Sequence, residues 1–196
     1  MKYGELNLGQ IEAIVNKLGG MDGVQRFLAG TSEVIAKGLF ERLATTIAIP
    51  TVASFTSSGF FIIDTSKKAT VKISGLGDNF KKHFLPKVEK NEVAAEDLAI
   101  NKLLEYAYDP AIITALGGEA KVEITLGQFF SAFAKQPNGE AGPLLTNGYA
   151  NVGYIRDIEG VLWAVFGRWR VDGWYFGARP LDDPFRWNVD NQFLSR

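Results

Sequence analysis

Residues 149–181 read YANVGYIRDIEGVLWAVFGRWRVDGWYFGARPL, and this stretch decides the fold of the chain. It contains three runs rich in β-branched and aromatic residues, at 149–156, 161–171 and 174–181. The joint between the last two runs is Asp172-Gly173, a strong hairpin signal, because Gly accepts a positive φ freely and Asp tolerates it. The stretch therefore predicts a three-stranded antiparallel meander.

A two-residue turn at Asp172-Gly173 would set the register of the last two strands. It places Val171 opposite Trp174, and side chains then alternate between the two faces of the sheet. One face, which we expect to be core, carries Val171, Trp169, Trp174 and Phe176. The other face carries Arg168, Arg170, Tyr175 and Arg179.

These four residues are the candidate ligand-binding site of the sequence. Guanidinium groups match planar oxyanions and aromatic rings stack on bases, so the strip suits a phosphate, a carboxylate or a stacked base. The alternative is an ordinary exposed face whose arginines pair with nearby carboxylates. Those carboxylates are Asp157, Glu159, Asp182 and Asp183. The pair Asp157 and Glu159 and the pair Asp182-Asp183 also suggest acid–base or metal chemistry, although each pair lies beside Gly or Pro in a connection, where turn formation explains it better.

The N-terminal part predicts helices. Asn7 is a plausible N-cap for a helix that ends at Gly19-Gly20, and a second helix over 21–29 is expected to bury Val24, Phe27 and Leu28. Such a pair can read DNA, but its second helix offers Arg26 beside Asp22, which argues against phosphate binding. The helix–Gly-Gly–helix pattern returns over 111–126, by duplication or by coincidence.

The middle of the chain gives weaker signals. It predicts a helix within 31–48, a hairpin of 60–64 with 69–74, a helix over 79–85 capped by Asp78, and a helix over 92–108. Alternation at Val71 and Ile73 indicates one buried face. His83 lies near the end of the third of these elements, where the helix dipole suits it.

Further helices are expected at 109–117, capped by Asp109, and at 119–135. The second carries an apolar stripe with three phenylalanine residues, which we expect to be core. The loop 137–148 follows.

The composition excludes several classes of function. The chain has 196 residues, 21 Lys plus Arg against 22 Asp plus Glu, one His and no Cys. The balanced charge gives no general attraction to nucleic acid or anionic membrane. The missing Cys excludes disulfides and thiolate chemistry, and a single His excludes multi-His metal centres. Residues 1–10 lack signal-peptide features and no apolar run is long enough to span a membrane, so we expect a cytoplasmic protein.

Both ends of the chain carry distinctive motifs. They are LGQIEAI, NKLGG, GV and RFL near the N-terminus, and LTNGYAN, YIRD, GVLWAV, DGW, DP, W and FLSR near the C-terminus. In these motifs the chain resembles a family of short uncharacterised bacterial proteins. The resemblance implies a bacterial cytoplasmic protein and a single unit, and it implies no activity.

The sequence therefore predicts an α+β domain over 1–196, with a helical and hairpin part at 1–136, a loop at 137–148 and an antiparallel sheet at 149–196. N-terminal and central helices would pack on the sheet. The leading functional hypothesis is a non-enzymatic binding protein for an anionic ligand or a protein partner, without a cofactor or bound metal. The alternatives are a nucleic-acid-binding protein and a metal-dependent hydrolase.

Overall fold

The computed structural model describes residues 7–30 and 38–196. Contacts group the chain into two compact units, residues 1–37 and residues 38–196, where the sequence suggested one domain. The single domain over 1–196 stays a prediction.

The first unit contains helices α1 (Leu8–Lys17) and α2 (Gly20–Leu28). The Asn7 side chain accepts the N–H of Gln10 at 2.9 Å, and the Gln10 side chain accepts the N–H of Asn7 at 2.9 Å. This reciprocal capping box satisfies two backbone donors that the helix leaves unpaired. The predicted first helix and its N-cap are confirmed.

Glycines make the sharp junction between α1 and α2. Gly19 and Gly20 have φ values of +86° and +81°, which only glycine adopts readily. The same device joins α4 (Asp109–Ala115) to α5 (Glu119–Val122), where Gly117 and Gly118 have φ values of +99° and +91°. Both parts of the predicted repeat therefore have two successive glycines with positive φ between their helices, but Gly20 is the first residue of α2 whereas Gly118 precedes α5.

The predicted burial of Phe27 and Leu28 is wrong. Their exposed fractions are 44% and 77%, because two short helices have too little surface to enclose large side chains. The residue of α2 that is buried is Gly23.

The second unit is built on a mixed sheet of seven strands. In spatial order they are β1 (Phe40–Ile49), β5 (Glu96–Leu103), β9 (Gln192–Ser195), β6 (Asn151–Arg156), β7 (Leu162–Trp169), β8 (Trp174–Pro180) and β3 (Ile73–Leu76). β6, β7 and β8 pair antiparallel as predicted. β9 and β3 lie parallel to β6 and β8 on either side of them. The α+β class is confirmed, whereas a separate sheet of three strands is wrong.

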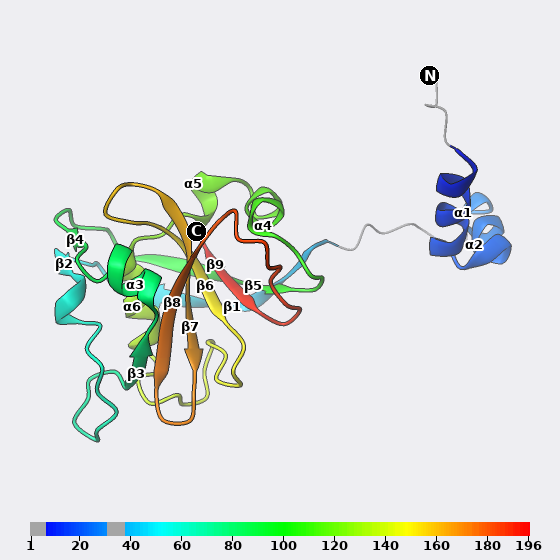
Figure 1. The fold of residues 1–196 in the computed structure, drawn as a ribbon. Helices are drawn as coiled ribbons and strands as arrows, with labels where there is room; N and C mark the ends of the chain where they lie inside the picture. Colours follow the sequence, from blue (N-terminus) through cyan, green and yellow to red (C-terminus); the bar gives the residue numbers. More distant parts are fainter. Residues whose placement is uncertain (1–6, 31–37) are drawn as a thin grey trace. The chain divides into compact units, whose positions relative to one another are not determined.

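Helices cover both faces of the large sheet (Figure 1). On one face, α3 (Asp78–His83) and α6 (Leu126–Phe133) form an aromatic core with side chains of β7 and β8. On the other face, α4 and α5 form a second core with side chains of β5, β6 and β7. A smaller sheet of β2 (Phe55–Thr56) and β4 (Val88–Glu89) and the 3₁₀ helix η1 (Ser57–Gly59) complete the unit.

The turn between β7 and β8 differs from the predicted one. Arg168 pairs with Tyr175, so the connection comprises residues 170–173 and is closed by the Arg170 N–H and the Gly173 carbonyl at 2.9 Å. The predicted two-residue turn is wrong, and Val171 is fully exposed in the loop. Trp174 donates its N–H to the Lys72 carbonyl at 2.8 Å, which ties the start of β8 to the segment before β3.

The corrected register differs from the predicted one by two residues. Because side chains alternate with a period of two, an even shift leaves every residue on the face first assigned to it. Trp174 and Phe176 lie in the core and Trp169 packs against it, whereas Arg168, Tyr175 and Arg179 belong to the opposite face, as predicted.

Two predicted helices are strands. Residues 40–49 form β1, and the remainder of the predicted helix at 31–37 lies outside the described residues. Within 92–108, residues 96–103 form β5, which pairs with β1 and β9. Residues 98–101 of β5 are buried consecutively, on both faces of the sheet, so the strand lacks the alternation of buried and exposed residues that marks a strand with one wet face.

The predicted helix over 119–135 is broken in two. Ile124 donates its N–H to the Tyr154 carbonyl at 3.0 Å, so the chain runs extended beside β6 at this point. Thr125 and Gln128 then form a capping box that starts α6. The three phenylalanine residues of α6 are buried, as predicted.

The predicted hairpin of 60–64 with 69–74 is reduced to one bridge between Asp64 and Ile73. β3 pairs with β8 instead, although Val71 and Ile73 are buried as expected. Asp78 occupies the first turn of α3, and the N-cap is Gly77.

Within the described ranges, no helix is both long and apolar enough to cross a membrane.

Candidate functional site

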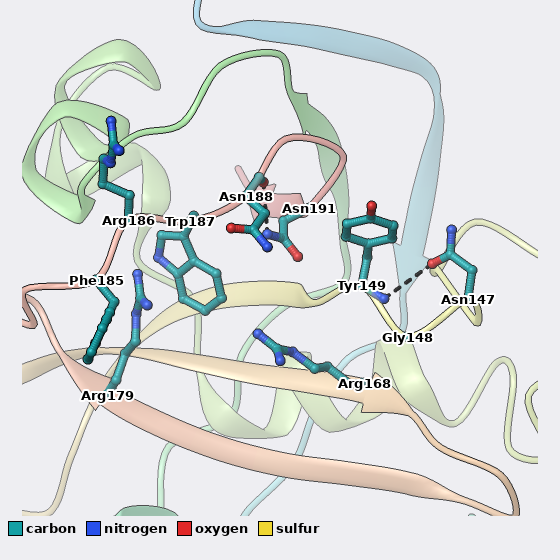
Figure 2. A pocket seen from close by; sticks show the side chains of 10 residues that line it. All are labelled: Asn147, Gly148, Tyr149, Arg168, Arg179, Phe185, Arg186, Trp187, Asn188 and Asn191. Carbon is teal, nitrogen blue, oxygen red and sulfur yellow. Dashed lines mark hydrogen bonds between the residues drawn. The ribbon is translucent and has the colours of Figure 1, made fainter.

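An arginine-lined pocket of about 540 Å³ opens beside β7 and β8 on the face that carries Arg168 and Arg179. We call it the arginine pocket. It is lined by Asn147, Gly148, Tyr149, Arg168, Arg179, Phe185, Arg186, Trp187, Asn188 and Asn191 (Figure 2). Two loops, one before β6 and one between β8 and β9, form its sides around the two strand arginines. None of the lining residues is acidic.

Arg179 is held in place from two sides. One of its terminal nitrogens donates to a carboxylate oxygen of Asp109 at 3.3 Å. Its guanidinium carbon lies 3.6 Å from the centroid of the Trp187 ring, a cation–π contact. The position of Arg179 is therefore fixed before any ligand arrives.

Asp109 is the anchor beneath this arginine. It is 1% exposed, and its Oδ1 accepts from the Tyr154 hydroxyl at 2.7 Å and from the Trp187 Nε1–H at 2.7 Å. Burial raises the pKa of the Asp109 carboxyl, against the opposing effect of its donors and of Arg179. Burial and the neighbouring carboxylate also raise the pKa of Tyr154. The predicted N-cap role of Asp109 is wrong, because Tyr108 caps α4.

Arg168 has no such partner. Among the described residues no carboxylate pairs with it, and its buried Nε–H has no hydrogen-bond acceptor. Its guanidinium lies 4.9 Å from the centroid of the Phe166 ring. Burial lowers the pKa of Arg168, as do the nearby charges of Arg179 and Arg170. A partly desolvated cation beside other cations is a favourable place for an anion.

The four predicted site residues fall into two groups in the structure. Arg168 and Arg179 line the arginine pocket. Arg170 lies in the exposed loop 170–173, where its guanidinium stacks 3.7 Å from the centroid of the Tyr175 ring, and neither residue belongs to the lining. The predicted continuous strip is therefore two separate groups of side chains.

Sequence reasoning missed the loop residues of the pocket. Asn191 accepts the Ala150 N–H at 2.7 Å and donates to the Asn188 carbonyl at 2.8 Å, which holds the second loop against the start of β6. The turn at Asn147-Gly148 was visible in the sequence. Nothing local to the 185–191 segment indicates that it lies against the start of β6, next to that turn.

Two of the carboxylates considered for catalysis, Asp157 and Asp183, have structural partners. Asp157 Oδ1 accepts the N–H groups of Glu159 and Val161 at 2.8 and 2.9 Å, which stabilises the β6–β7 turn. Its Oδ2 lies 3.1 Å from His83 Nδ1 and accepts the Trp163 Nε1–H at 3.0 Å. Burial acts to raise the pKa of Asp157, but these bonds outweigh it and the pKa is lowered.

Asp183 likewise accepts the Phe185 N–H at 2.8 Å in a turn. In the part of the chain that the structure describes, no three His, Asp or Glu side chains form a group that suits a metal ion.

No family model, curated protein or solved structure matches the chain, so the resemblance to the bacterial family stays a prediction and function is argued from the arginine pocket.

Proposed function

We propose that the chain is a non-enzymatic binding protein that holds an anionic ligand in the arginine pocket. The observation that carries this proposal is Arg168, a partly buried guanidinium with an unpaired Nε–H in a pocket whose lining has no carboxylate. Buried donors and charges in native proteins normally have partners, and each exception needs an explanation. A bound oxyanion would be the missing partner.

The chemistry of the lining favours recognition over reaction. The charged lining groups are guanidiniums, which remain protonated in proteins and neither give nor take a proton in a catalytic cycle. The remaining polar side chains are three amides, the Tyr149 phenol and the Trp187 indole, whose N–H is already bound to Asp109. Such groups orient a ligand through hydrogen bonds.

Two features support a preformed pocket. Arg179 is fixed by Asp109 and Trp187, and Asn191 fixes the 185–191 loop against β6. Groups held in place before binding lose little conformational entropy when the ligand arrives. The two alternative functions, nucleic-acid binding and metal-dependent hydrolysis, remain predictions from the sequence.

The test is thermal unfolding of the full chain in phosphate, sulfate or succinate against chloride at constant ionic strength. A ligand that binds the folded state and not the unfolded state raises the melting temperature, by an amount that grows with the logarithm of its concentration above the Kd. We expect at least one of the three anions to raise it in the wild type. Constant ionic strength matters because screening alone changes the stability of charged proteins.

The matched variants are Arg168→Met in β7 and Arg170→Met in the loop 170–173, two positions further along the chain. We expect the anion-induced rise to be lost in Arg168→Met and kept in Arg170→Met, because Arg170 is outside the lining. An equal rise in Arg168→Met and wild type, or no rise with any of the three anions, would overturn the proposal.

A further inference from the structure

Helices α1 and α2, which we call the helix pair, leave most of their large apolar side chains exposed. The buried residue of the pair is Gly23, which has no side chain to bury. Six large apolar side chains have exposed fractions between 44% and 80%, those of Leu8, Ile11, Ile14, Met21, Phe27 and Leu28. So much exposed apolar surface on one small unit marks a site of interaction with another surface.

The helix pair is nevertheless a well-defined piece of structure. Gly19 and Gly20 turn the chain at positive φ, and a Cβ at Gly23 would lie 1.6 Å from the Leu18 carbonyl oxygen. The start of α2 therefore packs directly on the end of α1. The capping box at Asn7 fixes where α1 begins.

Two helices of this size need a further surface to be stable. α1 has 10 residues and α2 has 9, whereas isolated helices below about 12–15 residues are marginal in water. Folded units below about 40 residues usually rely on disulfides, metals or oligomerisation. The chain has no Cys, and residues 7–30 contain no group of acidic or His side chains that suits a metal ion. Oligomerisation is the remaining means of the three.

The spacing of the apolar residues suits packing against other helices. In α1 and at its C-cap, Leu8, Ile11, Val15 and Leu18 follow one another at intervals of three and four residues. In α2 the apolar residues 21, 24 and 28 have the same spacing. Such intervals place side chains along one seam, which is the pattern of helices that interlock in bundles.

The charges of the helix pair favour a second copy of the same pair as the partner. Each helix carries one acidic and one basic residue, Glu12 and Lys17 in α1, and Asp22 and Arg26 in α2. Because these charges sum to zero, two copies do not repel each other, whereas a charged partner gains no attraction. A two-fold axis places the same surface opposite itself, so that apolar side chains meet apolar side chains.

The exposed area is also of the size that a dimer needs. A large apolar side chain removes roughly 60–120 Å² from water when it is buried. The six exposed side chains therefore offer several hundred square ångström per copy. A stable interface buries about 800 Å² per partner, which is the same order of magnitude.

We propose that the helix pair is a dimerisation module, which packs against the helix pair of a second copy of the chain to form a bundle of four helices. This proposal goes beyond the anion-binding function and does not depend on the arginine pocket.

Sedimentation velocity of the full chain, at concentrations up to about 100 μM, tests the proposal because a dimer depends on protomer concentration. We expect the wild type to reach the mass of two chains. Ile14→Glu in α1 and Phe27→Glu in α2 should each sediment as one chain, because they bring like charges together across the two-fold axis. Ile62→Glu is the matched control, since Ile62 is an exposed apolar residue of the other compact unit, and it should remain a dimer.

A second measurement does not rely on disrupting the helices. Because the chain has no Cys, Ile14→Cys and Ile62→Cys each introduce a single thiol. A bismaleimide whose spacer bridges the roughly 8–10 Å between packed helices should join two copies of Ile14→Cys. We expect several-fold less covalent dimer from Ile62→Cys under the same conditions.

The proposal is overturned by a wild type that sediments as one chain at every concentration. A dimer that persists in both Ile14→Glu and Phe27→Glu, or that is lost in Ile62→Glu, would place the interface outside the helix pair and overturn it too. Equal cross-linking of the two Cys variants would have the same meaning.

Discussion

The Tyr154 hydroxyl donates a hydrogen bond to the buried carboxylate of Asp109 over 2.7 Å, and this contact joins β6 to α4 beneath the arginine pocket. Removing the carboxylate leaves the Tyr154 hydroxyl, the Trp187 N–H and the Arg179 charge without their acceptor. We expect Asp109→Ala to lower the free energy of unfolding by about 3–5 kcal/mol, the range for breaking one side of a buried ion pair. Tyr154→Phe removes one donor and should cost about 1–3 kcal/mol. Urea unfolding measures both, and a smaller loss in Asp109→Ala than in Tyr154→Phe would contradict the anchoring role of Asp109.

Arg168 should reduce stability while no anion is bound. Its charge is partly buried, lacks a carboxylate partner and lies near Arg179 and Arg170. Arg168→Met keeps the length of the side chain and removes the charge, so we expect the free energy of unfolding in chloride to rise by about 0.5–2 kcal/mol, as for other substitutions at functional positions. Arg179→Met should have the opposite effect, because it leaves Asp109 buried and unpaired. Lower stability of Arg168→Met in urea unfolding would show that Arg168 has a structural role.

Local signals account for what the sequence predicted correctly. The N-cap Asn7 and the stop at Gly19-Gly20 are local to the first helix, and they predicted it correctly. The face assignment of Arg168 and Arg179 depends on the period-two alternation of strands and not on the length of the turn. It therefore remained correct although the register at Asp172-Gly173 was wrong by two residues.

The failures arise from contacts that are distant in sequence. β1 and β5 are strands because they pair with each other and β5 also pairs with β9, about ninety residues further on. The pocket has the same origin, since its loops before β6 and after β8 meet only when β9 inserts beside β6. The residues next to Trp187 and Asn191 in the sequence give no signal that these two side chains line a pocket. The sequence therefore predicted the two strand arginines of the pocket but not the loop residues around them.

Asp157 should stabilise the protein less as the pH falls. Its lowered pKa means that, between the folded value and the ordinary value of 3.8, the unfolded state binds more protons than the folded state. The stabilisation by Asp157 is therefore complete at pH values above its ordinary pKa. It is lost as the pH falls through the pKa that Asp157 has in the folded state. We expect Asp157→Asn to be less stable than the wild type by about 1.5–3 kcal/mol at pH 5, from hydrogen bonds to a charged group. Urea unfolding from pH 5 to pH 2 should show this difference shrink, and a constant difference would mean that folding does not lower the pKa of Asp157.

Gly167 should be intolerant of any side chain, because the aromatic core occupies the space above it. A Cβ at this position would lie 2.3 Å from Cε1 of Phe133, closer than real Cβ contacts allow. The Phe133 ring packs edge-on against Trp174 at 4.7 Å and Phe176 at 4.9 Å between centroids, so it cannot move without disturbing both. We expect Gly167→Ala to lower the free energy of unfolding by about 1–3 kcal/mol through overpacking. Gly59→Ala is the control, because no atom lies within 4 Å of its Cβ position and a surface substitution changes stability by about 0.5 kcal/mol or less. Equal stability of the two variants in urea unfolding would show that the core between α6 and the sheet is looser than these contacts indicate.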